Sequence, residues 1–309
     1  MRGFAKGGDN DKMSEASHHR NWFSTLADYW TLTKPEVNFL VVASTLAGFY
    51  LGTLGPLDGT RLLHTLFGTL LVASGTGTLN QFIERRHDAH MRRTANRPLP
   101  SGRLAASHAL WFGIALSVAG GLDLALAVNT LSSVLALATL ASYLVFYTPL
   151  KRRTPLCTLV GAFPGAMPPL IGWAAARGSL SPEAWVLYAV LFLWQFPHFL
   201  AIAWMYREDY ARAGLRMLPS RDLELGRFTR REIFAFTLAL VPVSLVPVAM
   251  GQAGMLYLTG ALLLGLAFLA CGARLAFSRS NVLARRLVLA SVVYLPLVLA
   301  LLMIDKVRV

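Results

Sequence analysis

The chain has 309 residues, 55% of them hydrophobic, and a formal net charge of +13. A mean hydropathy of +0.51 and long apolar runs exclude an ordinary soluble protein, in which about 45–50% of residues are apolar. The basic residues alternate with the apolar runs, so membrane topology explains the charge better than a nucleic-acid partner does. The two cysteines, Cys157 and Cys271, lie in apolar segments and are expected to be free thiols.

Residues 1–34 are polar and lack the apolar stretch of a signal peptide, so we predict a flexible tail there. Residues 35–309 are predicted to form one all-α polytopic domain with nine transmembrane helices, because nine apolar segments are long enough to cross a bilayer. The predicted spans are 37–55, 62–83, 105–122, 128–148, 155–175, 184–206, 232–250, 255–275 and 286–304. Prolines inside the fifth, sixth and seventh spans predict kinks or breaks.

The basic residues outside these spans are distributed unevenly. On this map 20 Lys and Arg residues lie on one side of the membrane and 4 on the other. Basic loops remain in the cytoplasm, so the N-terminus is predicted to be cytoplasmic and the C-terminus outside.

The densest group of ionisable residues follows the second apolar run, at residues 80–103. If the helix continues past Leu79, then Asn80, Glu84 and Asp88 lie on one face, because residues four apart are neighbours on a helix. Six arginines share this stretch: Arg85, Arg86, Arg92, Arg93, Arg97 and Arg103. Oxygen ligands beside guanidinium groups suit a Mg²⁺-bound diphosphate. Positive-inside topology would explain the arginines, but not the spacing of the acidic and amide residues.

A second polar group, Glu208 and Asp209, lies at the cytoplasmic end of the sixth predicted span. Two acidic clusters at one depth could together hold two metal ions on a diphosphate. Within the same span, His198 is an ionisable residue at membrane depth, where such groups usually face a cavity. It could ligate haem iron, transfer a proton, or be a neutral histidine hydrogen-bonded to another helix.

These residues also carry a resemblance to a known family. The pattern Asn80-x3-Glu84-x3-Asp88-x2-Met91-x-Arg93-Thr94-x2-Arg97-Pro98 resembles the first signature of the intramembrane UbiA-type prenyltransferases, and its second half is most similar to haem O synthases. The segments PHF (197–199) and EDYARAG (208–214) resemble the second signature, and YTPLKRRT (147–154) resembles a basic loop of that family. The similarity extends from Lys34 to the last span. Glu84 departs from the pattern because most members have aspartate there, and Glu208-Asp209 is less rich in aspartate than usual.

The resemblance implies helices around a central cavity in a bacterial cytoplasmic membrane. It implies transfer of farnesyl from farnesyl diphosphate to a vinyl group of haem b, which forms haem O and releases diphosphate, with Mg²⁺ as cofactor. Membrane lipid surrounds such an enzyme, and haem A synthase or terminal-oxidase assembly factors are the expected protein partners. The site residues expected on this basis are Asn80, Glu84, Asp88, Glu208 and Asp209 for the metal, Arg93, Arg97, Lys151 and Arg152 for the diphosphate, and His198 as a catalytic residue alongside Asn80, Glu84, Asp88 and Asp209.

Two other functions remain open on the sequence alone. A related prenyltransferase acting on an aromatic quinone precursor would share the metal site but lack the histidine-bearing PHF segment. A transporter would also contain broken helices and intramembrane polar groups. The acidic residues here lie near a predicted membrane surface rather than at its midplane, which favours the enzyme. The sequence contains neither a P-loop nor the DDxxD motif of soluble prenyl synthases.

Overall fold

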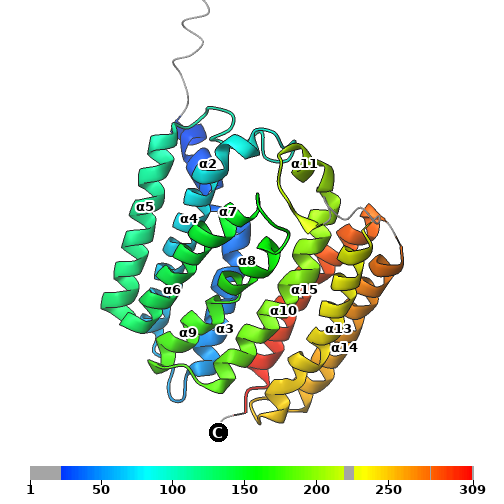
Figure 1. The fold of residues 1–309 in the computed structure, drawn as a ribbon. Coiled ribbons are helices and arrows are strands. Elements are labelled where there is room, and N and C mark those ends of the chain that lie inside the picture. Colours follow the sequence, from blue (N-terminus) through cyan, green and yellow to red (C-terminus); the bar gives the residue numbers. More distant parts are fainter. Residues whose placement is uncertain (1–21, 219–225, 279, 308–309) are drawn as a thin grey trace, which may run out of the picture.

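The computed structural model describes residues 22–218, 226–278 and 280–307. Over these ranges the chain is a bundle of helices (Figure 1). The elements are α2 (Trp22–Thr33), α3 (Pro35–Gly52), α4 (Gly59–Asp88), α5 (Ala106–Asp123), the π-helical turn η1 (Leu124–Val128), α6 (Thr130–Ser142), η2 (Tyr143–Tyr147), α7 (Thr148–Leu150), α8 (Cys157–Gly165), α9 (Pro168–Arg177), α10 (Pro182–Met205), α11 (Arg207–Arg212), α13 (Arg227–Ala249), α14 (Met255–Phe277) and α15 (Asn281–Ile304).

Eight of the described helical segments are long and apolar enough to cross a membrane, which makes this an integral membrane protein with multiple spans. Each predicted span corresponds to one or more helices, but the first, α3, is not among the eight. Its 18 residues include Glu36 and Asn38 in the first turn, together with Ser44 and Thr45, which lower its hydropathy. The prediction of nine spans therefore differs from the structure at this helix.

α3 nevertheless lies inside the bundle, where it packs closely against α9. A Cβ atom on Gly48 would lie 2.1 Å from the Pro169 carbonyl oxygen, and one on Gly172 would lie 2.0 Å from the Thr45 carbonyl oxygen. Only glycine permits the two backbones to approach so closely, as is common where membrane helices cross. The close contact holds α3 beside the helices that carry the polar residues.

The predicted effect of prolines depends on their position. The fifth predicted span is broken into α8 and α9, with Pro164 near the end of α8 and Pro168 at the start of α9. Pro197 in α10 and Pro242 in α13 lie inside helices that continue past them. A proline at the first position of a helix loses no hydrogen bond, so consecutive prolines begin α9 after the break.

The predicted flexible tail differs from the structure over its last third, because Trp22–Thr33 form helix α2. Residues 1–21 lie outside the described residues. α2 exposes Trp22, Phe23 and Trp30 and buries Leu32, a pattern typical of a helix lying in a membrane interface. Its buried carboxylate, Asp28, forms a 2.9 Å ion pair with the Arg103 guanidinium group.

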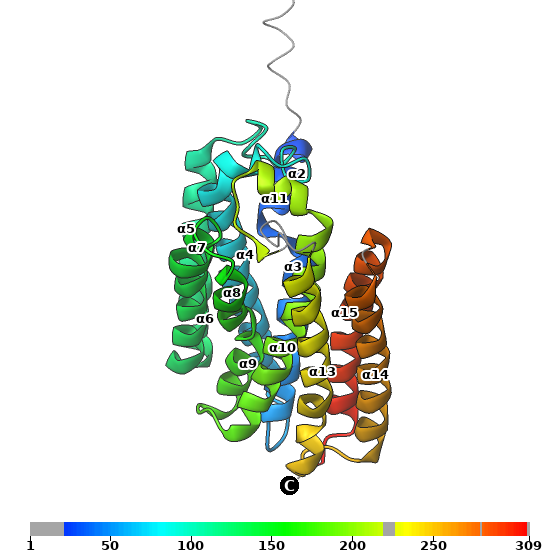
Figure 2. The same cartoon turned by 45° about the vertical axis from the view of Figure 1, so that its right-hand side comes forward.

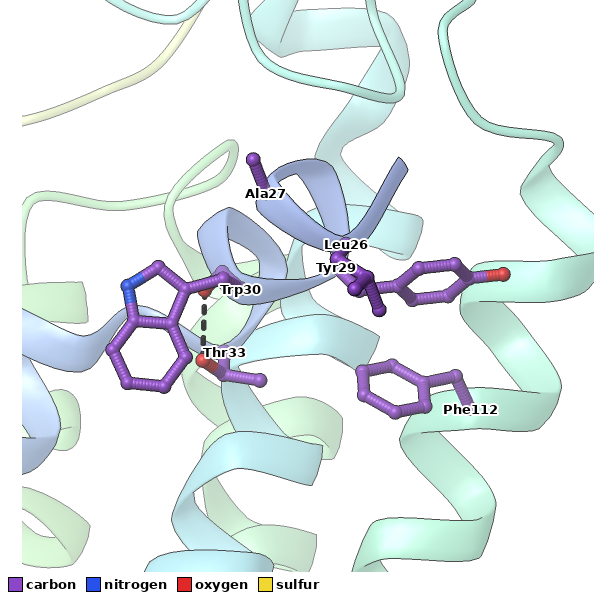
Figure 3. Close-up of a pocket in the computed structure, with 6 residues that line it drawn as sticks. All are labelled: Leu26, Ala27, Tyr29, Trp30, Thr33 and Phe112. Carbon is purple, nitrogen blue, oxygen red and sulfur yellow. Dashed lines mark hydrogen bonds between the residues drawn. The ribbon is translucent and has the colours of Figure 1, made fainter. Parts of the chain in front are cut away.

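A pocket of about 460 Å³ lies between α2 and α5 (Figure 3). It is lined by Leu26, Ala27, Tyr29, Trp30, Thr33 and Phe112. The rings of Tyr29 and Phe112 meet edge to face, with centroids 4.9 Å apart. The lining has no charged side chain, so this pocket cannot neutralise a diphosphate.

The ends of the bundle differ in what they carry. α2, α11 and the connection from α4 to α5 lie at one end, and the C-terminal end of α15 lies at the other (Figures 1 and 2). The two polar groups singled out from the sequence therefore share one end of the molecule.

Candidate functional site

Helix α4 carries the first polar group, and it runs without interruption from Gly59 to Asp88. The helix therefore continues past Leu79, which is the condition on which the shared face of these residues depended. Asn80 and Asp88 are each 1% exposed, and the Glu84 side chain is 14% exposed. The spacing of four residues turns all three side chains inward, and we call Asn80, Glu84 and Asp88 the α4 stripe.

Every member of the α4 stripe is hydrogen-bonded to a basic side chain from another part of the chain. The three donors are Lys34 Nζ, 2.9 Å from Asn80 Oδ1, Lys151 Nζ, 2.9 Å from Glu84 Oε1, and Arg97 Nη1, 2.7 Å from Asp88 Oδ2. Three cations thus surround two carboxylates and an amide in a mostly buried site. Charge-assisted hydrogen bonds of this kind are the strongest available to side chains.

The pKa values of the two lysines reflect their burial and the charges around them. Burial, reinforced by the nearby Arg97 and Lys151 cations, lowers the pKa of the Lys34 ammonium group to about 7. Burial also opposes the charged form of Lys151, but the Glu84 carboxylate outweighs it and holds the pKa of that ammonium group well above its usual range. The direct partner of Lys34 is an amide rather than a carboxylate. An added anion would therefore stabilise the charged form of Lys34 more than that of Lys151 or Arg97.

The second polar group contributes one residue rather than two. Asp209 on α11 is buried, its carboxylate pairs with the Arg212 guanidinium group, and it accepts a 3.4 Å hydrogen bond from the Arg93 backbone N–H. The neighbouring Glu208 side chain is 85% exposed and lies 3.9 Å from Arg207. The structure therefore brings Asp209 against the loop that follows α4 and leaves Glu208 on the surface.

Two of the four predicted diphosphate-binding residues contact the α4 stripe. They are Arg97, which is bonded to Asp88, and Lys151, which is bonded to Glu84. Arg93 is exposed and lies over the second group, with its guanidinium carbon 5.0 Å from the Tyr206 ring centroid and one nitrogen 3.5 Å from the Tyr210 hydroxyl. Arg152 is exposed in the loop after α7 and is not brought to the stripe.

His198 lies apart from the stripe, half-buried on α10 and facing α15. Its Nδ1 is 2.6 Å from Ser291 Oγ, and its ring stacks on Trp194 with centroids 5.0 Å apart. The Ser291 hydroxyl oxygen also lies 2.6 Å from the Val288 carbonyl oxygen, an arrangement that suits donation from His198 Nδ1 to Ser291. The hydrogen bond to another helix, one of the alternatives for His198, is therefore present, and it leaves Nε2 unengaged by Ser291.

Lys34 is the residue of this site that the sequence analysis missed, because it was assigned to the tail. It adopts a left-handed conformation, with φ 55°, between α2 and α3. Two buried amide side chains hold this junction: Gln81 donates to the Leu32 carbonyl at 3.0 Å, and Asn38 donates to the Thr33 carbonyl at 2.8 Å. The signal in the sequence was a lone lysine directly before the proline that begins the first apolar helix.

The α4 stripe fits Mg²⁺ only together with a phosphate ligand. Within residues 22–218, 226–278 and 280–307, no three His, Cys, Asp or Glu side chains are grouped closely enough to hold a metal. Mg²⁺ commonly takes one or two protein carboxylates and completes its shell with phosphate and water. Hard oxygen donors on one helix face meet that need, and the basic side chains paired with them are suited to bind the phosphate oxygens.

Comparison with known proteins shows the family to which the chain belongs. Residues 41–299 match the UbiA prenyltransferase family. The chain belongs to the UbiA prenyltransferase family. It is 55% identical to a protoheme IX farnesyltransferase of Solibacter usitatus, over 91% of this chain and 99% of that one. A protoheme IX farnesyltransferase of Salinibacter ruber is 47% identical, again over 91% of this chain and 99% of the relative.

Solved structures of the family share the fold. A digeranylgeranylglyceryl phosphate synthase superposes with a TM-score of 0.74 at 17% identity, covering 91% of this chain and 98% of that one. A UbiA homologue from Archaeoglobus fulgidus, bound to DMAPP and Mg²⁺, superposes with a TM-score of 0.63 at 15% identity, covering 89% and 99%. The predicted UbiA-type fold is confirmed.

Proposed function

We propose that this protein transfers the farnesyl group of farnesyl diphosphate to a vinyl group of haem b, forming haem O and releasing diphosphate. The observation that carries the proposal is the α4 stripe, in which each inward-facing oxygen is matched to a basic side chain. The relatives named protoheme IX farnesyltransferase, at 55% and 47% identity over nearly their whole length, support haem b as the acceptor.

The basic residues of the site bind the diphosphate in this proposal. Arg97 presents a planar fork that matches two phosphate oxygens, whereas Lys34 and Lys151 act as point charges. All three are held in place before the substrate arrives, by the stripe and by the α2–α3 junction. Preorganised charge of this kind stabilises the negative charge that grows on a leaving diphosphate.

Asn80, Glu84 and Asp88 are the residues proposed to hold Mg²⁺, with Asp209 contributing from the opposite side of the site. When bound, Mg²⁺ supplies a Lewis acid that neutralises charge on the diphosphate. Glu84 reaches one methylene further than an aspartate, and its carboxylate accepts a hydrogen bond from the Lys151 side chain, which follows α7. Glu208 and Arg152 face outward, so they are weaker candidates than the sequence suggested.

His198 is proposed to act on the haem rather than on the diphosphate. Because Ser291 engages Nδ1, Nε2 is the atom available to ligate iron or to accept a proton. On α10 the residue lies 11 positions before Asp209, or about 16 Å along a helical path at about 1.5 Å per residue. A prenyl chain with its diphosphate at the α4 stripe could extend over such a separation.

The proposed orientation places the α4 stripe at the cytoplasmic side and the C-terminus outside, because the basic loops lie at the stripe end. Fusions after Val309 should be active with an exported phosphatase and dark with a fluorophore that matures only in the cytoplasm. The reverse pair of results would invert the orientation.

The test of the proposed function is product mass. Purified protein in detergent, given haem b, farnesyl diphosphate and Mg²⁺, is expected to yield haem O and free diphosphate, with no product from 4-hydroxybenzoate. A prenylated aromatic acid with haem b unchanged would assign the chain to the related aromatic prenyltransferases instead.

A further inference from the structure

The end of the bundle opposite the α4 stripe contains few basic residues, and these gather in one place. Of the described Lys and Arg residues, only Arg61, Arg177 and Lys306 lie at this end. Arg61 and Arg177 both line a pocket of about 510 Å³ with Phe49, Gly52, Thr53, Leu54, Gly55, Pro56, Asp58, Ala176 and Ser179. Lys306 donates to the carbonyl of Thr53, a residue of the same lining. Since topology selects against arginine on the outer side, two arginines in one pocket need an explanation.

Capping of helix ends uses only some of the hydrogen-bond donors of Arg61 and Arg177. Arg177 Nε donates to the Gly52 carbonyl at 2.8 Å, at the C-terminus of α3, and Arg61 Nη2 donates to the Val128 carbonyl at 3.3 Å, at the end of η1. A guanidinium group has five N–H donors, and each cap occupies one. Among the described residues neither arginine forms an ion pair with a carboxylate, although Glu183 lies within electrostatic reach of Arg177, and Asp58 is engaged by the Arg61 backbone N–H.

The pocket is also far from the candidate active site. Arg61 precedes Asn80 by 19 residues on α4, which is about 29 Å at about 1.5 Å per residue. The pocket therefore cannot share a diphosphate with the α4 stripe. It lies instead where two membrane-spanning segments, α4 and the α8–α9 segment, end.

Its surroundings are those of a lipid headgroup region. Leu54 lines the pocket and is exposed, Leu57 is exposed in the same loop before Arg61, and Phe49 forms an apolar wall of the pocket. Arg177 lies 4.7 Å above the Trp173 ring, which fixes its position. Paired guanidinium groups with exposed leucines beside them match a phosphate that carries acyl chains better than a soluble anion.

We propose that Arg61 and Arg177 form a binding site for the phosphate of an anionic membrane phospholipid, at the end of the bundle opposite the α4 stripe. The guanidinium groups bind the phosphate oxygens, and the acyl chains lie along the exposed leucines. This site is independent of prenyl transfer, so it stands or fails separately from the proposed function.

Native mass spectrometry of the purified full chain with added phosphatidylglycerol tests the proposal. The double variant R61Q/R177Q is expected to bind this lipid about tenfold more weakly, the loss of two charge-assisted contacts. R286Q, an exposed arginine on α15, is the matched control and is expected to bind like the wild type. Prenyl transfer is expected to be unchanged in the double variant.

Several results would overturn the proposal. They are unchanged phosphatidylglycerol binding in the double variant, an equal loss in R286Q, equally tight binding of phosphatidylcholine, or displacement of the lipid by millimolar inorganic phosphate. If the double variant does not purify as a folded protein, lipid binding by the single variants R61K and R177K tests the site instead. Each keeps the charge but loses the guanidinium fork, so binding is expected to weaken several-fold, and unchanged binding in both would contradict the site.

Discussion

The two acidic groups of this protein differ in the helices that carry them. The α4 stripe lies on a 30-residue helix, where a spacing of four residues keeps all three side chains on one inward face. Glu208 and Asp209 are adjacent on a six-residue helix, so they point about 100° apart, and only Asp209 is buried. Spacing along a long helix therefore predicts a shared site, whereas adjacency on a short one predicts that a single member faces inward.

The largest effect is expected at Asp88, the last residue of the α4 stripe. Asp88→Asn keeps the shape of the side chain but removes the charge proposed to hold Mg²⁺, and the rate of prenyl transfer should fall by about a thousandfold. The thermal unfolding midpoint of the variant serves as the folding control. Near-wild-type activity across a magnesium titration would remove Asp88 from the metal site.

A smaller loss is expected at Glu84. Glu84→Gln should lower the rate by about a hundredfold, because Lys151 also loses its carboxylate partner. Glu84→Asp should be milder, since the charge remains and only the reach changes. Equal activity of the Gln and Asp variants would show that charge at residue 84 is not what the reaction uses.

A loss confined to one substrate is expected at Arg97. Arg97→Lys keeps the charge but not the fork, so the KM for farnesyl diphosphate should rise about tenfold with little change in the KM for haem b. Steady-state kinetics with each substrate varied in turn measures this. An equal rise in both values would indicate a structural role in holding Asp88.

The smallest effect is expected at Glu208. Glu208→Gln should change the rate by less than about twofold, because exposed ion pairs contribute little. Asp209→Asn is the matched comparison and should be far more damaging. If both variants lost activity equally, the claim that only the inward-facing Asp209 takes part in the reaction would be wrong.

Much of the architecture could be predicted from the sequence, and so could the stripe. Apolar run length located the spans, and the spacing of Asn80, Glu84 and Asp88 predicted a shared face for a helix that extends beyond its apolar part. α3 was harder to classify because a helix packed against other helices can bury polar residues such as Asn38 and need not be apolar. Its position depends on Gly48 and Gly172, whose role appears only when α9 is in place.

The rest of the site depended on contacts between distant segments. Lys34 reaches Asn80 across 46 residues of sequence because Gln81 and Asn38 hold the α2–α3 junction in a left-handed conformation. No local pattern indicates such a junction. The outward positions of Glu208 and Arg152 likewise depend on how a short helix and a loop are rotated, which composition does not determine.

Binding of an unreactive analogue, farnesyl thiolodiphosphate, with and without Mg²⁺ tests most directly whether the α4 stripe binds the metal and the diphosphate. We expect Mg²⁺ to tighten binding to the wild type and to Glu208→Gln, but not to Asp88→Asn. If Mg²⁺ tightened binding to the Asp88→Asn variant as strongly as to the wild type, the α4 stripe would not be the metal and diphosphate site.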